Sequence, residues 1–219
     1  MGIEIDLLRN YPQAKRDLDS RTRETSENVK LIAREFGQEF FDGERKFGYG
    51  GFSYDERFWS PVIPDFESHF KDLASKSLLD VGCAKGFMLF ELKKMVPGIK
   101  VAGIDISKYA IANCLPSVRE DVQVGNAVRL PFGDDSFDIV ISINTVHNLE
   151  LEDCKEALRE ISRVAQRGSF VTVDAYSNEQ QRERMFAWNL TARTILSVEE
   201  WKSLFEEVGY AGDYYWFMP

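Results

Sequence analysis

Residues 78–87 read LLDVGCAKGF and carry the strongest single signal in this 219-residue chain. The apolar start predicts a buried strand, Gly82 predicts a tight turn, and the residues from 85 onward continue as an amphipathic helix to Met95. In open α/β sheets, ligands bind beyond the carboxyl ends of the strands, where the strand order reverses. We therefore expect the loop at 82–86 to border a ligand site, with Gly86 letting the backbone lie close to the ligand.

The rest of the chain alternates strands and helices around this loop. The predicted strands are 77–81, 99–105, 121–125, 136–142, 168–176 and 213–218, and the predicted helices are 85–95, 107–114, 151–165 and 197–209. Continuous apolar strands separated by helices are typical of a parallel sheet covered on both faces. The sequence thus predicts an α/β, Rossmann-like, doubly wound and mostly parallel sheet of six strands, or seven if one is recruited from elsewhere.

The organisation around this sheet suggests two parts. Residues 1–74 are expected to form an N-terminal helical and aromatic cap region, with a helix over 24–40, a glycine-rich loop over 41–59 and a short helix from Pro61 to Leu73. Residues 75–219 are expected to form the ligand-binding domain, with a lid segment at 177–196.

Composition narrows the class of protein. The net charge of −9 and the pI near 4.9 disfavour nucleic acid as the main partner. The three cysteines are widely spaced and only two histidines are present, so we expect no metal site and no disulfide framework. With no signal peptide and no long apolar run, we expect a cytoplasmic protein without a membrane partner, as a monomer or homodimer.

An acidic residue marks the nucleotide-binding side of the predicted site. Asp105 follows Gly86 by 19 residues, at the end of the second strand, where a carboxylate can accept hydrogen bonds from ribose hydroxyls. A dinucleotide fingerprint starting at Gly82 would need glycine at positions 84 and 87, which are Ala84 and Phe87. The alternative ligand carries no phosphate and is adenosine joined to methionine through a sulfonium.

Four segments in order then resemble the class I S-adenosylmethionine-dependent methyltransferases, in the broad small-molecule group that includes the quinone methyltransferases. These segments are LLDVGCAKG, GIDIS, GNAVRLPFGDDSFDIVIS and LREISRVAQRGSFVTVD. The resemblance covers about residues 75–210. The flanks also bear a weak likeness to methyltransferases found with bacterial surface-polysaccharide genes. The resemblance implies S-adenosylmethionine as cofactor and a small-molecule methyl acceptor.

The same resemblance implies a role for each matched residue. Asp80 and the backbone of Gly82 and Cys83 would hold the methionine end of the cofactor, and Asn144 would lie under it. Asp105 would bind the ribose with Ile106 beside the adenine, which Asn126 and Ala127 would border. Cys83 is expected to be a small packing residue, and Lys85 is expected to point to solvent.

Methyl transfer also requires an acceptor with a free lone pair. His147 follows the fourth strand, and its ordinary pKa suits a general base. Alternatively, His147 forms a wall of the pocket or bonds the backbone. Asp174, at the end of the fifth strand, could bind or deprotonate the acceptor, or it could bond loop amides.

Aromatic and basic residues in the two flanking regions are candidates for selecting the acceptor: Tyr49, Trp59, Tyr176, Trp188 and Arg193. Rings beside arginines and amides suit a polar, sugar-like or phosphorylated acceptor. We therefore expect O-methylation of a small polar molecule. The alternatives are C- or N-methylation of a quinone-like or amine metabolite, and a non-catalytic subunit that binds S-adenosylmethionine.

Overall fold

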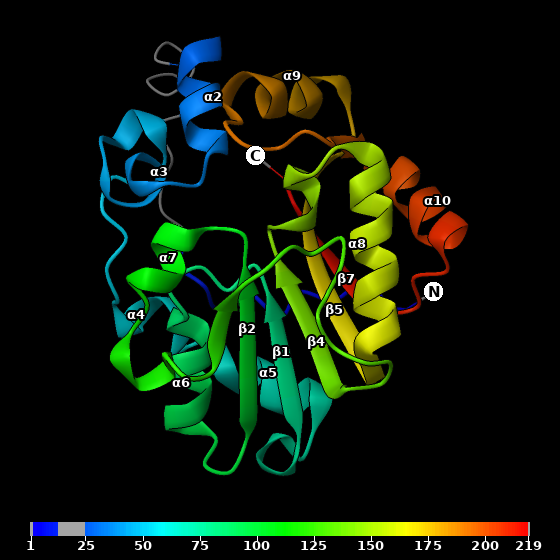
Figure 1. The fold of residues 1–219 in the computed structure, drawn as a ribbon. Coiled ribbons are helices and arrows are strands. Elements are labelled where there is room, and N and C mark those ends of the chain that lie inside the picture. The colour runs from blue at the N-terminus through cyan, green and yellow to red at the C-terminus, as the bar shows by residue number, and fades with distance from the viewer. Residues whose placement is uncertain (1, 13–24, 219) are drawn as a thin grey trace.

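The computed structural model describes residues 2–12 and 25–218. A sheet of seven strands runs through its centre (Figure 1). The strands are β1 (Ser77–Val81), β2 (Lys100–Asp105), β3 (Val122–Val124), β4 (Phe137–Ile143), β5 (Ala165–Tyr176), β6 (Leu196–Ser197) and β7 (Asp213–Phe217). Their order is β3-β2-β1-β4-β5, and both β6 and β7 pair with β5. Every pairing is parallel, so the predicted fold class is confirmed with seven strands.

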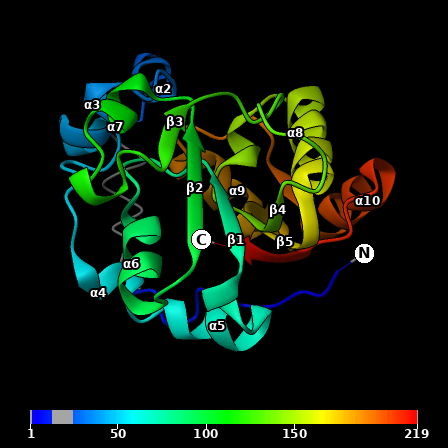
Figure 2. The same cartoon turned by 60° about the horizontal axis from the view of Figure 1, so that its bottom comes forward.

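Helices cover both faces of this sheet (Figure 2). One face packs on α5 (Ile63–Phe70), α6 (Phe87–Met95) and α7 (Lys108–Ala112), and the other on α8 (Leu151–Val164) and α10 (Val198–Val208). Each face has its own apolar core, represented by Phe66 and Leu89 on the first and by Ile161 and Trp201 on the second, all fully buried. Ser197 and Glu200 form a capping box at the start of α10.

The far edge of the sheet is built by both ends of the described chain. β7 runs parallel to β5, with Phe170 opposite Asp213. The N-terminal segment lies along β7, where the Ile5 amide donates to the Tyr214 carbonyl at 3.0 Å and the Tyr214 amide donates to the Ile3 carbonyl at 3.1 Å. The family usually ends in an antiparallel pair, and this parallel edge replaces it.

The cap region differs from its predicted pattern. Two helices, α2 (Glu27–Arg34) and α3 (Gln38–Asp42), replace the single helix expected over 24–40, whose first residue lies outside the described residues. The break falls at Phe36, whose φ of 49° is left-handed, and at Gly37, the N-cap of α3. The expected loop over 41–59 contains a 3₁₀ turn at Arg45–Phe47 and α4 (Glu56–Trp59). Of the helices described, none is long and apolar enough to cross a membrane.

Candidate cofactor and acceptor site

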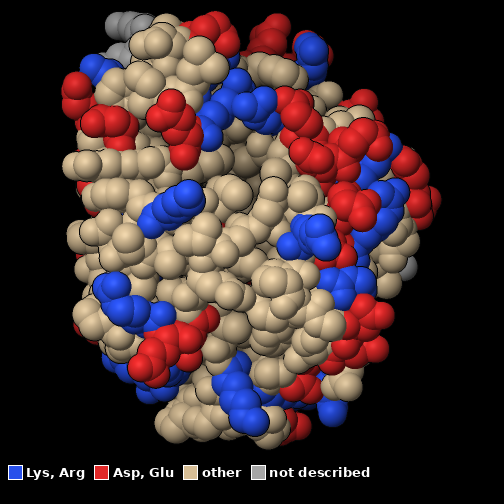
Figure 3. Space-filling view, viewed as in Figure 1, with Lys and Arg blue, Asp and Glu red and all other residues tan. Residues whose placement is uncertain are grey.

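The predicted ligand loops meet at one edge of the sheet. β1 lies between β2 and β4, so the loops that follow these three strands face the same space at the point where the strand order reverses. The molecular surface is hollowed there, between α7 and α8 and below α2 and α9 (Glu179–Trp188), and Lys and Arg atoms border the upper rim of the hollow (Figure 3).

Asp105 is held in a fixed orientation at the end of β2. Its Oδ2 accepts the amide of Ala84 at 2.7 Å, and its Oδ1 accepts the amide of Ser107 at 2.8 Å. Burial raises the pKa of Asp105, while these two hydrogen bonds oppose the rise. The next residue, Ile106, leaves 55% of its surface exposed. An oriented acid next to an open apolar side chain suits a ribose joined to an adenine.

Asp80 lies one strand away and is buried. Burial, with a further contribution from the charge of Asp105, raises the pKa of Asp80 to about 7. A nearby positive charge stabilises the ionised form of a buried carboxyl. A cationic ligand beside Asp80 would therefore be bound more tightly by the ionised carboxylate. The ammonium and sulfonium groups of S-adenosylmethionine are such charges.

The glycine loop between these acids is tightly constrained. The amides of Gly82 and Cys83 both donate to the Ile104 carbonyl, at 2.7 and 3.2 Å. Any backbone contact of these two residues with the methionine part of the cofactor would therefore be made by their carbonyl oxygens. Gly82 has a φ of 93°, and a Cβ there would lie 2.1 Å from the Thr145 hydroxyl. Only glycine therefore lets the loops after β1 and β4 come this close.

Gly86 and Cys83 serve packing in this structure. A Cβ at Gly86 would lie 2.7 Å from the Val118 side chain, so close approach to a ligand at Gly86 stays a prediction. Cys83 is buried as expected, and burial raises the pKa of its thiol well above the usual range, with the charges of Asp80 and Asp105 adding to the rise. A neutral, buried thiol fits the packing role.

The remaining predicted cofactor residues lie on the same edge. Asn144 is exposed, and its Oδ1 accepts the Thr172 hydroxyl at 3.0 Å, which orients its amide group. Asn126 is also exposed, and its Oδ1 accepts the amide of Val128 at 3.1 Å. Ala127 beside it is half-buried. Contact of these residues with the cofactor stays a prediction.

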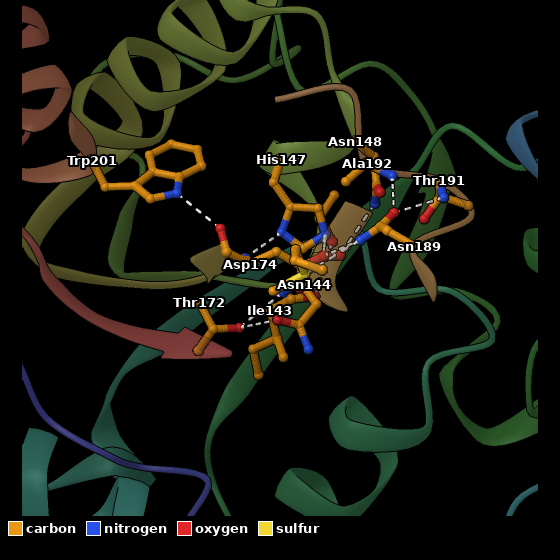
Figure 4. A network of polar contacts seen from close by, with 12 residues as sticks. Ile143, Asn144, His147, Asn148, Thr172, Asp174, Asn189, Thr191, Ala192 and Trp201 are labelled. Atoms are coloured by element: carbon orange, nitrogen blue, oxygen red, sulfur yellow. Dashed lines mark hydrogen bonds and ion pairs between the residues drawn. The ribbon is translucent and has the colours of Figure 1, made fainter. Parts of the chain in front are cut away.

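His147 and Asp174 form a buried pair between the ends of β4 and β5 (Figure 4). The Asp174 amide donates to His147 Nδ1 at 2.9 Å, and His147 Nε2 lies 3.7 Å from Asp174 Oδ2. A backbone amide can only donate, so Nδ1 is the unprotonated nitrogen and Nε2 carries the proton. Burial lowers the pKa of His147, although the charge of Asp174 opposes this. The nitrogen that carries the lone pair of the neutral ring, Nδ1, is therefore occupied by a backbone amide, which argues against the general-base hypothesis for His147.

Asn189 joins this pair to the lid segment. Its Nδ2 donates to Asp174 Oδ2, and its Oδ1 accepts the amides of Thr191 and Ala192, at 3.0 and 2.7 Å. The Asp174 carbonyl accepts the indole N–H of Trp201 at 2.9 Å (Figure 4). Asp174 is thus bonded inside the protein, as in the structural alternative for this residue. The sequence marks Asn189 only as one polar residue of the lid.

The residues predicted to select the acceptor separate in the structure. Trp59 packs edge-on against Tyr11, with ring centres 5.1 Å apart, in the core beside α6, which argues against a substrate role. The Tyr176 hydroxyl lies 3.4 Å from Glu200 on α10, and Arg193 pairs with Glu150 at 2.5 Å. Trp188 is buried against Phe217, with 5.7 Å between ring centres. These contacts do not test whether Tyr176, Arg193 and Trp188 bind the acceptor, so their substrate roles stay predictions.

Tyr49 belongs to an aromatic cluster that covers the first ligand loop. It stacks on Phe41 and lies 4.2 Å from Phe52, centre to centre, and Phe52 stacks in turn on Phe87 at 4.8 Å. The start of α6 is therefore covered by a ring. This cover agrees with the argument that Phe87 disfavours a pyrophosphate there.

The expectation that Lys85 points to solvent is wrong. Lys85 is only 6% exposed, and its ammonium pairs with Asp42 of α3 at 2.7 Å. No pattern in the sequence marks Asp42 as its partner, because the two residues are 43 positions apart.

The cap region and the lid segment also touch each other. Leu190 packs against Val29 and Ala33 of α2, and the Arg34 guanidinium donates to the Ala192 carbonyl at 3.2 Å. In Figure 1, α2 and α9 lie next to each other above the hollow. Together they roof the site.

Two further surface features lie away from this edge. A groove of about 320 Å³ runs between α8 and α10, and one of about 220 Å³ lies between the N-terminal segment and α5. Within residues 2–12 and 25–218, no cluster of His, Cys, Asp and Glu has the geometry of a metal site.

Comparison with known proteins agrees with this geometry. Residues 79–173 match the family described as a methyltransferase domain. This match supports a methyltransferase domain of the class I, S-adenosylmethionine-dependent type over these residues.

Among individual relatives, an uncharacterised protein of Haemophilus influenzae is 34% identical over 148 residues, covering 62% of this chain and 58% of that protein. A tRNA (carboxymethyluridine(34)-5-O)-methyltransferase of Arabidopsis thaliana is 33% identical over 164 residues, covering 68% and 38%. The O-methyltransferase resE of Aspergillus sclerotiorum is 29% identical over 149 residues, covering 63% and 55%. The chain thus spans roughly 40 to 60% of the length of these relatives.

Solved structures share the fold. The YcgJ protein of Bacillus subtilis has a TM-score of 0.54 at 21% identity, covering 67% of this chain and 66% of that one. A SAM-dependent methyltransferase of Archaeoglobus fulgidus has a TM-score of 0.52 at 21% identity, covering 70% of each chain. At these identities the likeness concerns the fold alone.

Proposed function

We propose that this chain transfers the methyl group of S-adenosylmethionine to an oxygen of a small polar acceptor. The observation that carries the proposal is the Asp105 carboxylate, oriented by two backbone amides beside the exposed Ile106, at the edge of the sheet where the family binds its cofactor. Asp80, with its raised pKa, would face the positive end of the methionine.

The state of His147 and Asp174 narrows the acceptor chemistry. The Asp174 amide donates to His147 Nδ1, the nitrogen that carries the lone pair of the neutral ring, and Asn189 donates to Asp174 Oδ2. We infer that neither side chain serves as the base for a hydroxyl acceptor. An oxygen that is already anionic at neutral pH, such as a carboxylate or an acidic hydroxyl, needs no base. Lys and Arg atoms lie at the upper rim of the hollow, with Asp and Glu atoms on either side of them (Figure 3).

The transfer is then a single in-line displacement. A lone pair of the acceptor oxygen attacks the methyl carbon while the bond from carbon to sulfur breaks and its electron pair stays on sulfur, giving S-adenosylhomocysteine. The chain contributes by holding acceptor, methyl and sulfur in line and by excluding water, a proximity effect. The roof made by α2 and the lid segment fits this exclusion.

Two of the relatives support oxygen as the acceptor atom, since one is named a 5-O-methyltransferase and the other an O-methyltransferase. C-methylation of a quinone-like molecule is less favoured, because Trp59 and the cluster around Tyr49 pack on other rings of the chain. The acidic net charge continues to disfavour RNA as the acceptor.

Methyl-labelled S-adenosylmethionine tests the proposal with four sets of acceptors: small carboxylic acids and sugar acids, neutral sugars, hydroquinones, and tRNA. We expect label to enter the acids, and to be lost when Asp105→Ala replaces the wild type. Label entering only hydroquinone carbon or tRNA would contradict the proposed acceptor class. No transfer to any acceptor, with S-adenosylmethionine bound, would favour the non-catalytic alternative.

A further inference from the structure

Lys85 occupies a place in the first ligand loop where its charge serves no ligand directly. Its ammonium donates to both oxygens of Asp42, at 2.9 and 2.7 Å, and to the Phe52 carbonyl at 2.8 Å. All three acceptors lie on residues 36–52, which we call the covering segment. The ammonium also lies 5.9 Å from the centre of the Phe52 ring and 5.7 Å from that of Tyr109.

Asp42 gathers donors from three parts of the chain. Besides Lys85 it accepts the Tyr109 hydroxyl of α7 at 2.6 Å and the Phe52 amide at 2.9 Å. Burial raises the pKa of Asp42, but the hydrogen bonds from Lys85, Tyr109 and the Phe52 amide outweigh it, so the pKa lies below its usual range. The carboxylate is therefore charged at neutral pH. The ion pair joins the covering segment to the loop before α6, and the Tyr109 hydrogen bond joins it to α7.

A second contact ties the same segment to the loop after β2. The Ser107 hydroxyl donates to the Phe36 carbonyl at 2.5 Å. Lys85 directly follows Ala84, and Ser107 is the residue after Ile106. Ala84 and Ser107 are the two residues whose amides orient Asp105. The covering segment is thus fastened on both sides of the carboxylate that would hold the ribose.

We propose that Lys85 is a positioning residue that fastens the covering segment over the cofactor, so that the cofactor leaves only when the Lys85–Asp42 ion pair opens. The proposal rests on the proposed cofactor site. The side chain of Lys85 is 8% exposed and that of Asp42 is 28% exposed, so solvent screens this pair less than the pairs on the surface. Lys85 thus makes three hydrogen bonds from the first ligand loop to the covering segment.

The test measures the rate at which S-adenosylhomocysteine dissociates, by stopped-flow displacement with excess S-adenosylmethionine. We expect Lys85→Met and Asp42→Asn each to raise this rate about tenfold, since breaking an interaction of this kind acts mainly on dissociation. The double variant should be no faster than the faster single one, because both changes remove the same link. Lys85→Arg keeps the charge and should stay within about threefold of wild type.

The matched control is Lys93→Met. Lys93 lies on α6, the helix that follows the loop of Lys85, and it pairs with Asp121 at 2.6 Å and with the Ser117 carbonyl, both outside the covering segment. We expect the dissociation rate of this variant to equal that of wild type. Unfolding curves on all variants separate a local effect from general destabilisation, and Asp42→Asn carries the test if Lys85→Met does not fold.

The outcomes distinguish this inference from the function it rests on. Tight S-adenosylhomocysteine binding with equal dissociation rates in Lys85→Met, Asp42→Asn, Lys93→Met and wild type would overturn the role of Lys85 alone. A wild-type chain that binds neither S-adenosylhomocysteine nor S-adenosylmethionine would overturn the proposed cofactor site, and the inference with it.

Discussion

The Nδ1 atom of His147 accepts the backbone amide of Asp174 at 2.9 Å. This one hydrogen bond joins the loop after β4 to the end of β5 and decides which nitrogen of the ring carries the proton. It converts a histidine with the expected position of a general base into a structural acceptor. The first prediction follows from it.

His147→Asn should keep the fold and the methyl-transfer rate, because the amide oxygen of asparagine can take the place of Nδ1 as acceptor. His147→Leu leaves the buried Asp174 amide without an acceptor and should lower the free energy of unfolding by about 1–3 kcal/mol. Denaturant unfolding and initial rates over pH 6–9 check both. A folded His147→Asn with turnover reduced by orders of magnitude and an altered pH profile would restore the base hypothesis.

The buried imidazole also makes stability depend on pH. Burial lowers the pKa of His147 below its unfolded value of 6.5, so below pH 6.5 the unfolded chain binds a proton that the folded chain does not. Wild-type stability should therefore fall as the pH drops below about 6.5. The free energy of unfolding of wild type, relative to that of His147→Asn, should therefore decrease as the pH falls from 7.5 to 5. A constant difference would contradict the depressed pKa.

Asp80 should make stability depend on pH in the opposite direction. Its pKa rises from 3.8 to about 7 on folding, so the folded chain without ligand binds an extra proton between these values and loses stability as the pH rises through them. A cationic ligand favours the ionised carboxylate. Affinity for S-adenosylmethionine should therefore strengthen as the pH rises through about 7, with proton release, and Asp80→Asn should remove this component.

Calorimetry in two buffers of different ionisation enthalpy measures that proton release. Subtracting the Asp80→Asn data removes the titration of the ligand itself. Equal pH dependence in both proteins would show that Asp80 is not the group facing the cation.

Ala84 offers a prediction about backbone conformation. Its φ of 49° lies in the left-handed region, where a Cβ is unfavourable, and its amide orients Asp105. Ala84→Gly should raise the free energy of unfolding by about 0.5–1 kcal/mol, after allowing for the greater freedom of glycine in the unfolded chain. Ala102→Gly, in β2, is the control and should destabilise. Loss of stability in both variants would contradict the strain at Ala84.

Asn189 and Asn178 lie at the two ends of α9 and allow a matched comparison. Asn189→Ala removes the donor to buried Asp174 and the acceptor of two amides, and should cost about 2–4 kcal/mol. Asn178→Ala removes only an N-cap bond to Gln181 at 2.9 Å and should cost about 1 kcal/mol. Thermal unfolding compares them. An equal loss of stability in the two variants would mean that Asn189 stabilises the fold no more than a helix-capping residue does.

The sheet and the cofactor edge could be predicted because their signals are local. Apolar strand runs, the Gly82 turn and the position of Asp105 after β2 each need only a few neighbouring residues. A strand over 213–218 was predicted, but its parallel pairing with β5 was not, and the N-terminal segment was not either, because it pairs with β7 across about 210 positions.

The partners of several side chains could not be predicted, for a physical reason. Residue type and position suggested His147 as a base and Lys85 as a solvent-exposed residue. Their roles depend on partners distant in sequence, the Asp174 amide and the Asp42 carboxylate. Trp59 shows the same effect, since an aromatic residue of the cap region can pack on Tyr11 as readily as line a pocket.

Calorimetric titration of the chain with S-adenosylmethionine, S-adenosylhomocysteine and NAD tests the central claim most directly. We predict binding of the first two with about one site per chain, none of NAD, and loss of both in Asp105→Ala. Tight binding of NAD with none of S-adenosylmethionine would contradict the account.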